Sequence, residues 1–151
     1  MKLVSLEETK TPLQETSFPI KQEVLDEMTK IMHDNHGIGL AAPQVGYLQR
    51  FFIYDLGKGH RGVCCNPKLY LRKQRRYYWA KEGCLTVPGQ EFMVKRLNTI
   101  RLRGFNQDGQ PFDWVCIGKL AQVLQHEMMH LEGKCIADGQ EIVNERDAAK
   151  E

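Results

Sequence analysis

The sequence predicts an α+β protein, and two observations point to this fold class. Two segments, 21–35 and 117–131, place their apolar residues on one face of a helix. Between them, residues 50–116 contain several short runs that read as strands, separated by glycine-rich turns. With 151 residues, the chain is long enough for a hydrophobic core and is most simply one domain, which we expect to span residues 1–151.

Composition and charge exclude several classes of protein. Charged residues make up 26% of the chain and the net charge is only +2, so we expect neither DNA nor a membrane as a partner. No apolar run approaches the ~20 residues that a membrane span needs. The N-terminus lacks the apolar segment of a signal peptide and the arginines of a transit peptide. We therefore expect the five cysteines to be reduced thiols in a cytoplasm rather than a disulfide framework.

The N-terminal part predicts an arm, a helix and a loop. Residues 1–19 contain two prolines, which suit an extended arm. Residues 21–35 predict a helix with one apolar stripe, and Gly37 suits the position just past its last turn. Residues 37–46, GIGLAAPQVG, predict a loop punctuated by glycines.

The middle of the chain predicts strands. We expect them at residues 50–55, 63–71, 77–80, 94–103 and 112–116, with Gly57, Gly59 and Gly62 breaking the chain after the first. Asp108 and Gly109 form a turn signal, so residues 112–116 would be the return strand of a hairpin. The charged residues 141–151 are expected to fray at the end of the chain.

The helix at 117–131 carries His126 and His130 with Glu127 between them. Histidines four apart lie on one face of a helix, so both imidazoles can reach one metal ion. The apolar arc of this helix consists of Leu120, Val123, Leu124, Met128 and Leu131, and Glu127 falls inside it. A buried glutamate without a partner is costly, and an activated water would supply that partner. These features favour a metal site over a chance pair of histidines.

A metal site that does chemistry needs a third protein ligand and an open position for water. In zinc peptidases of the metzincin type, the motif continues to a third histidine, but this chain has Ile136 there. Glu141 and Glu145 lie in a polar tail with little to hold them in place. Cys84 is the better third ligand, although a lone cysteine is more often a small buried hydrophobic residue.

Three motifs in this order, GIGLAAPQVG at 37–46, EGCLTVPG at 82–89 and QHEMMHLEG at 125–133, resemble the signature motifs of the peptide deformylase family. The similarity covers about residues 10–138. It implies an α+β fold with antiparallel or mixed sheets packed around a central helix that carries the histidine motif. It also implies an enzyme that removes the N-formyl group from the formylmethionine of nascent polypeptides and releases formate.

The resemblance implies a role for each of several residues. It implies Cys84, His126 and His130 as metal ligands, Glu127 as general base and acid, and Gln44 and the backbone N–H of Leu85 as donors to the oxyanion. Ile38, Gly39, Glu82, Gly83 and Val123 match substrate-binding positions. The implied cofactor is one divalent ion. We expect Fe(II) in the cell, with Zn(II) or Ni(II) in purified protein.

The chain departs from the family pattern at Met129, where the motif has aspartate. We expect that aspartate to pair with an arginine such as Arg96, and therefore predict weaker metal retention or activity in this chain. Thr86 replaces a serine and keeps the hydroxyl.

Only 20 residues follow Leu131, fewer than in many bacterial members. Such short forms occur among phage-encoded members, so we expect the cytoplasm of a bacterium, or of the host cell for a phage protein. Ribosome contact would then be transient proximity at most.

Two alternatives lead to different expectations. A metallopeptidase that cuts internal peptide bonds would have its third ligand downstream of His130 and would ignore the formyl group. A homologue that only binds metal or the ribosome would retain binding but release no formate.

Overall fold

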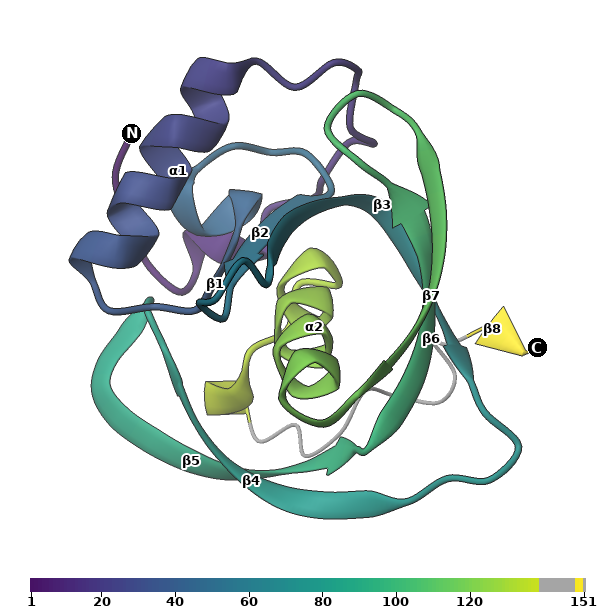
Figure 1. The fold of residues 1–151 in the computed structure, drawn as a ribbon. Coiled ribbons are helices and arrows are strands. Elements are labelled where there is room, and N and C mark those ends of the chain that lie inside the picture. Colours follow the sequence, from purple (N-terminus) through teal and green to yellow (C-terminus); the bar gives the residue numbers. More distant parts are fainter. Residues whose placement is uncertain (139–148, 151) are drawn as a thin grey trace.

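The computed structural model describes residues 1–138 and the backbone of 149–150, and it places one helix inside two curved sheets (Figure 1). The elements in chain order are η1 (Glu8–Lys10), α1 (Gln22–Asp34), β1 (Gly39–Ala41), η2 (Ala42–Val45), β2 (Phe51–Asp55), β3 (Arg61–Leu71), β4 (Tyr77–Cys84), β5 (Val87–Leu97), β6 (Thr99–Phe105), β7 (Pro111–Ile117), α2 (Gly118–Leu131), η3 (Ile136–Asp138) and β8 (Ala149–Lys150).

The larger sheet has the strand order β1-β2-β3-β6-β7, and all of these neighbours are antiparallel. The short strand β8 pairs with β3 in parallel. Strands β4 and β5 form a separate antiparallel hairpin. The two sheets curve around α2 from different sides, while α1 packs on the outside of the molecule (Figure 1). The predicted α+β fold with a central helix is therefore confirmed.

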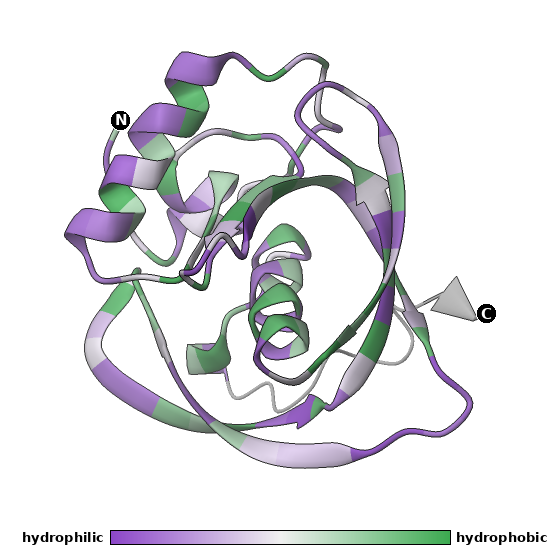
Figure 2. Cartoon of the chain, viewed as in Figure 1, coloured by the Kyte–Doolittle hydropathy of each residue, from purple (hydrophilic) through white to green (hydrophobic). Residues whose placement is uncertain are grey.

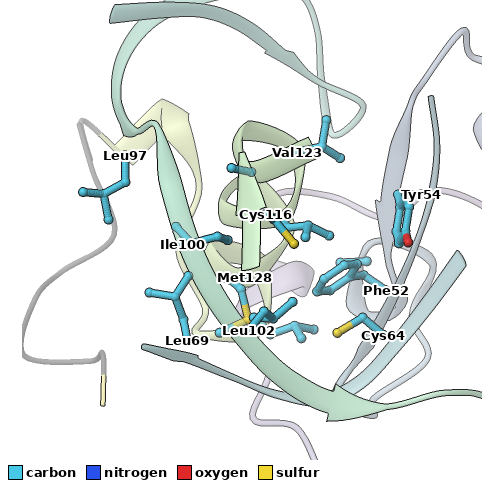
Figure 3. Packing of buried hydrophobic residues seen from close by; sticks show 14 of the residues in the cluster. Phe52, Tyr54, Cys64, Leu69, Leu97, Ile100, Leu102, Cys116, Val123 and Met128 are labelled. Carbon is cyan, nitrogen blue, oxygen red and sulfur yellow. The ribbon is translucent and has the colours of Figure 1, made fainter. Parts of the chain in front are cut away.

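Helix α2 is buried on nearly every side, because sheets enclose it. Ten of its fourteen residues are buried, including residues with polar side chains. Its apolar arc packs against the larger sheet, where Figure 3 shows Val123 and Met128 among side chains such as Phe52 and Leu102. The opposite side is covered as well, because Met129 lies in a second cluster with Ala80 and Val94 of the β4–β5 hairpin. The helix consequently carries hydrophilic residues at the centre of the protein (Figure 2).

The end of α2 follows the sequence prediction. Glu132 caps the helix, and Gly133 then adopts a φ of +73°, a backbone conformation that glycine tolerates best. Helix α1, the turn at Gly109 and strands β2, β3 and β7 also lie where the sequence predicts them, within one or two residues at each end. The prediction that residues 141–151 fray falls outside the described residues, apart from the paired residues 149–150.

The prediction of one strand over residues 94–103 is wrong. The chain changes sheets at Asn98, so that β5 belongs to the hairpin and β6 to the larger sheet. The backbone of Asn98 donates a hydrogen bond to Arg76 O and accepts one from Gly118 N. These bonds fix the crossing point between the two sheets. Strand β5 also begins earlier than predicted, at Val87.

Two further predictions from glycines need correction. Residues 37–46 are not simply a loop, because they contain β1 and η2. Gly62 does not break the chain but lies within β3, opposite Tyr54. A Cβ atom on Gly62 would come within 2.8 Å of Tyr54 Oη, so this glycine allows the tyrosine ring to lie against the strand.

None of the described helices is long and apolar enough to cross a membrane.

Replacing Leu124 by alanine should lower the free energy of unfolding by about 2–5 kcal/mol, because Leu124 is fully buried between α2 and the larger sheet. Urea unfolding followed by circular dichroism measures this loss. The matched control is Leu48→Ala at a side chain that is 42% exposed, which should stay within about 0.5 kcal/mol of the parent. Equal losses in both variants would contradict the central position of α2.

Candidate metal centre

Three separate parts of the chain meet at one place, namely the end of β4, η2 and α2. Cys84 is the last residue of β4, and Glu82 lies two residues earlier on the same strand. Gln44 belongs to η2, which follows directly after the edge strand β1. Helix α2 contributes both histidines and Glu127, at positions that repeat along one face. The sheets thus bring together residues that are far apart in the sequence.

The ligand atoms of Cys84, His126 and His130 all lie within 4.8 Å of one another. Cys84 Sγ is 3.3 Å from His130 Nε2. In a tetrahedral site with bonds of about 2.0–2.3 Å, a sulfur and a nitrogen ligand are roughly 3.5 Å apart, so the spacing fits a single ion. A thiol with two imidazoles is also a donor set that suits a divalent transition metal. The three predicted ligands are therefore brought together.

Glu127 is buried next to this group, with only 3% of its surface exposed. Within the described part of the chain, two buried side-chain atoms lack a hydrogen-bond partner, Glu127 Oε2 and His130 Nδ1. Burial raises the pKa of the Glu127 carboxyl. An unpaired carboxylate oxygen in the interior is costly, and a water between Glu127 and the converging ligands would satisfy it. The site thus fits a metal ion with an open position.

Glu82 links the centre to a buried arginine. Arg96 is fully buried and donates to both carboxylate oxygens of Glu82, at 2.8 and 2.6 Å. His126 Nδ1 lies 2.9 Å from Glu82 Oε1, so the imidazole can donate there and turn Nε2 toward the ion. Although burial opposes ionisation, the hydrogen bonds from Arg96 and His126 lower the pKa of Glu82 to about 2. Glu82 therefore remains charged and orients His126.

Met129 occupies the position where the motif described in the sequence has an aspartate. Its Sδ atom lies 3.1 Å from Arg96 Nη1, which donates to it. The sequence places Met129 on the side of the helix away from the apolar arc, yet the residue is 3% exposed, because the β4–β5 hairpin covers this side. Arg96 consequently has Glu82 as its charged partner, and a weakly accepting thioether on its remaining side.

Gln44 is held in a defined orientation. Its Oε1 accepts a hydrogen bond of 3.0 Å from the backbone N–H of Ala41, and its Nε2 lies 3.5 Å from Cys84 Sγ. The amide N–H groups therefore point toward the ligand group. Gly39 leaves room for the carboxylate, because a Cβ atom there would come within 2.7 Å of Glu127 Oε1.

A pocket of about 410 Å³ opens onto this group. It is lined by Ile38, Gly39, Gln44, Glu82, Gly83, Cys84, Leu85, Val123, His126 and Glu127, among others. Every predicted site residue lines it except His130, which is 2% exposed. The structure thus gathers all the predicted residues in one place, while their individual roles remain predictions.

Sequence reasoning missed three features of the centre. It placed Glu82 at a substrate-binding position, and Glu82 does line the pocket, but it missed the contacts of both carboxylate oxygens with Arg96 and His126. It considered Arg96 only as a partner of the missing aspartate. It gave no role to Cys135, whose Sγ lies 4.0 Å from Cys84 Sγ. For Glu82 and Arg96, an arginine at an inward-facing position of an alternating strand would have been a usable signal. Nothing in the sequence marks Cys135.

Over residues 4–145, the chain matches the sequence model of the family described as polypeptide deformylase. It is 30% identical to a peptide deformylase from Synechococcus elongatus that was solved in complex with actinonin, with a TM-score of 0.84, and the match covers 97% of this chain and 81% of that one.

Two phage proteins are similar over nearly their whole length. A probable peptide deformylase from Synechococcus phage S-SSM7 is 34% identical with a TM-score of 0.83, and the match covers 91% of this chain and 98% of that one. The corresponding protein of the Vibrio parahaemolyticus bacteriophage VP16T is 33% identical with a TM-score of 0.80, covering 89% of this chain and 99% of that one.

Replacing Met129 by aspartate should slow the loss of metal by up to roughly tenfold. The new carboxylate would give Arg96 Nη1 a charged acceptor and would add negative charge near the ion. Metal content after timed dialysis against a chelator measures the effect, with Met129→Leu as the control that keeps the position apolar. Equal metal loss from all three proteins would contradict the argument.

Proposed function

The chain belongs to the polypeptide deformylase family, and we propose that the group between α2 and β4 is the centre at which it removes the formyl group from N-formylmethionine. Deformylation of peptides is the activity of this family, so the chain is a hydrolase that depends on a divalent metal ion. The observation that carries the assignment of roles is the convergence of Cys84, His126 and His130 beside the buried carboxylate of Glu127.

The proposed ligands are Cys84, His126 and His130, with Fe(II) as the ion in the cell and Zn(II) or Ni(II) in purified protein. A thiolate is a soft ligand and reduces the charge of the site, which favours Fe(II) or Zn(II) over Mg(II). A bound ion of this kind would lower the pKa of a water ligand toward ~7 and would so supply the nucleophile at neutral pH.

Glu127 is proposed to carry the proton. Its free Oε2 atom can accept the proton of the attacking water, and the raised pKa of its carboxyl suits a group that must also give the proton back. The carbon of the formyl group becomes tetrahedral as its oxygen gains negative charge. Glu127 then donates the proton to the amine of methionine, and the C–N bond breaks to release formate.

The oxyanion is proposed to receive hydrogen bonds from the side-chain amide of Gln44 and the backbone N–H of Leu85. The hydrogen bond from Ala41 N–H to Gln44 Oε1 supports this role, because it leaves Nε2 as the end that faces the centre. Losing one donor of this kind typically costs ~10²–10³ in rate.

The substrate is proposed to lie along β1, which is the edge strand of the larger sheet. An extended peptide can add to such an edge through backbone hydrogen bonds, and Gly39 lies on this strand. Ile38, Glu82 and Val123 would surround the methionine side chain, with Gly83 as a further substrate-binding residue, since all four line the pocket. We place the reaction in the cytoplasm, on nascent chains in transient proximity to the ribosome.

The two alternatives find less support. A metallopeptidase of the metzincin type needs a ligand downstream of His130, but among the described residues the converging group is completed by Cys84. Its carboxylate candidates Glu141 and Glu145 lie outside the described residues. A homologue without activity would not need an unpaired buried carboxylate oxygen next to the ligands.

Anaerobically purified protein loaded with Fe(II) should release formate from formyl-Met-Ala-Ser. Cys84→Ala and Glu127→Ala should each abolish this release, the first together with metal binding and the second with the metal retained. The two variants thus separate loss of the ion from loss of the proton carrier. Cleavage of casein without release of formate would favour the peptidase instead.

Gly39→Ala should reduce formate release by at least ~10²-fold while metal content stays unchanged. The added Cβ would collide with Glu127 Oε1 and displace the carboxylate without touching a ligand. Gly59→Ala is the control, because this exposed glycine lies outside the pocket and a Cβ there would meet no atom within 4 Å. Full activity of Gly39→Ala would contradict the role of Glu127.

A further inference from the structure

A second thiol lies directly behind the ligand cysteine. Cys135 Sγ is 4.0 Å from Cys84 Sγ, and the two residues are 1% and 7% exposed. Cys84 lines the pocket, whereas Cys135 does not. In the described part of the chain, the group that converges within 4.8 Å consists of Cys84, His126 and His130, so Cys135 is not placed as a fourth ligand.

The backbone after α2 brings Cys135 to this position. Gly133 reverses the chain, and the N–H of Lys134 bonds back to Met129 O. Cys135 then donates its own N–H to Asp138 Oδ2, at 2.9 Å, at the beginning of η3. Its side chain packs in the same apolar cluster as Cys84 and Met129. The two sulfur atoms would have to close from 4.0 Å to about 2.05 Å for a disulfide to form, and rotation of the two side chains is the route we propose.

We propose that Cys84 and Cys135 are a redox pair, which hydrogen peroxide converts to a reversible disulfide when the metal is absent. The inference rests on the proposed function in taking Cys84 as a metal ligand. The disulfide would remove the thiolate from the ligand set, and the protein could not take up metal until it is reduced. The pocket gives peroxide access to Cys84, and Cys135 lies behind it as the resolving thiol.

The reaction balances with peroxide as the oxidant. Cys84 sulfur attacks one oxygen of hydrogen peroxide, the O–O bond breaks, and one water leaves as sulfenic acid forms. Cys135 sulfur then attacks the sulfenic sulfur, the S–O bond breaks, and a second water leaves as the S–S bond forms. Two thiols and one peroxide thus give one disulfide and two waters. A small thiol of the glutathione class reverses the oxidation and becomes a disulfide itself.

The remaining cysteines do not offer such a pair. Cys64 and Cys65 are neighbours on β3, but they face opposite sides of the sheet and pack in different clusters. Cys116 lies on β7, and, unlike Cys84, none of these three residues lines the pocket that gives access to the centre.

The test treats the full chain, reduced and stripped of metal with a chelator, with one equivalent of hydrogen peroxide. The count of free thiols should fall from five to three, and peptide mapping should find a cross-link between Cys84 and Cys135. A thiol reductant should restore all five thiols and the capacity to bind Co(II). Absence of the cross-linked peptide would overturn the proposal.

Two variants make the test specific. With hydrogen peroxide raised to at least three equivalents, the amount that the sulfonic acid requires, Cys84 of Cys135→Ala should pass beyond sulfenic acid to sulfinic or sulfonic acid, so that Co(II) binding no longer returns after reduction. The parent, held as the disulfide, should still recover Co(II) binding. Cys116→Ala removes another buried cysteine, and should still form and release the cross-link as the parent does. Full recovery of Co(II) binding in Cys135→Ala would overturn the protective role of the second thiol.

Failure of the redox pair and failure of the proposed function can be told apart. Formate release by the untreated, metal-loaded protein tests the assigned catalytic roles, while the cross-link is measured without substrate. Formate release without a cross-link overturns only the redox pair, and a cross-link without formate release overturns only the catalytic roles.

Discussion

The rest of the structure depends on the ion pair between Arg96 and Glu82. A fully buried guanidinium requires a charged acceptor, and Glu82 supplies one through two hydrogen bonds. The same carboxylate lies within hydrogen-bond distance of His126 Nδ1. The negative charge that compensates the buried guanidinium therefore also orients one imidazole of the metal centre. Because Arg96 and Glu82 lie on paired strands and His126 on α2, this one network joins the hairpin to the helix.

The enclosure of α2 explains why polar side chains lie within the apolar core. A helix covered on nearly every side must satisfy most of its polar side chains internally. Gln125 does so by exchanging hydrogen bonds with the backbone of Leu97 and donating to Ala121 O. Glu127 has no such partner for Oε2 in the described part of the chain. The contrast between the fully bonded Gln125 and the partly unbonded Glu127 supports a structural role for the first and the proposed reactive role for the second.

The sequence predicts the parts of this protein that depend on local pattern. Both helices follow from their apolar periodicity, and the three motifs contain every predicted site residue except Val123, which lies two positions before the third motif. The break at Asn98 was not predicted, because one interruption of the alternation does not distinguish an irregular strand from a change of sheet. The long-range hydrogen bonds to Arg76 and Gly118 reveal that change. The contact between Cys84 and Cys135 depends likewise on how the chain turns after Gly133, since 51 residues separate the two thiols.

The origin of the ligands in two different elements has a consequence for assembly of the fold. Cys84 is the last residue of β4, next to the turn of the β4–β5 hairpin, whereas both histidines belong to the central helix. A lone two-stranded hairpin is only marginally stable. An ion bound by both elements would bind the folded form alone. Its binding free energy would therefore add to the free energy of unfolding. Catalytic metal and structural cross-link would then be the same atom.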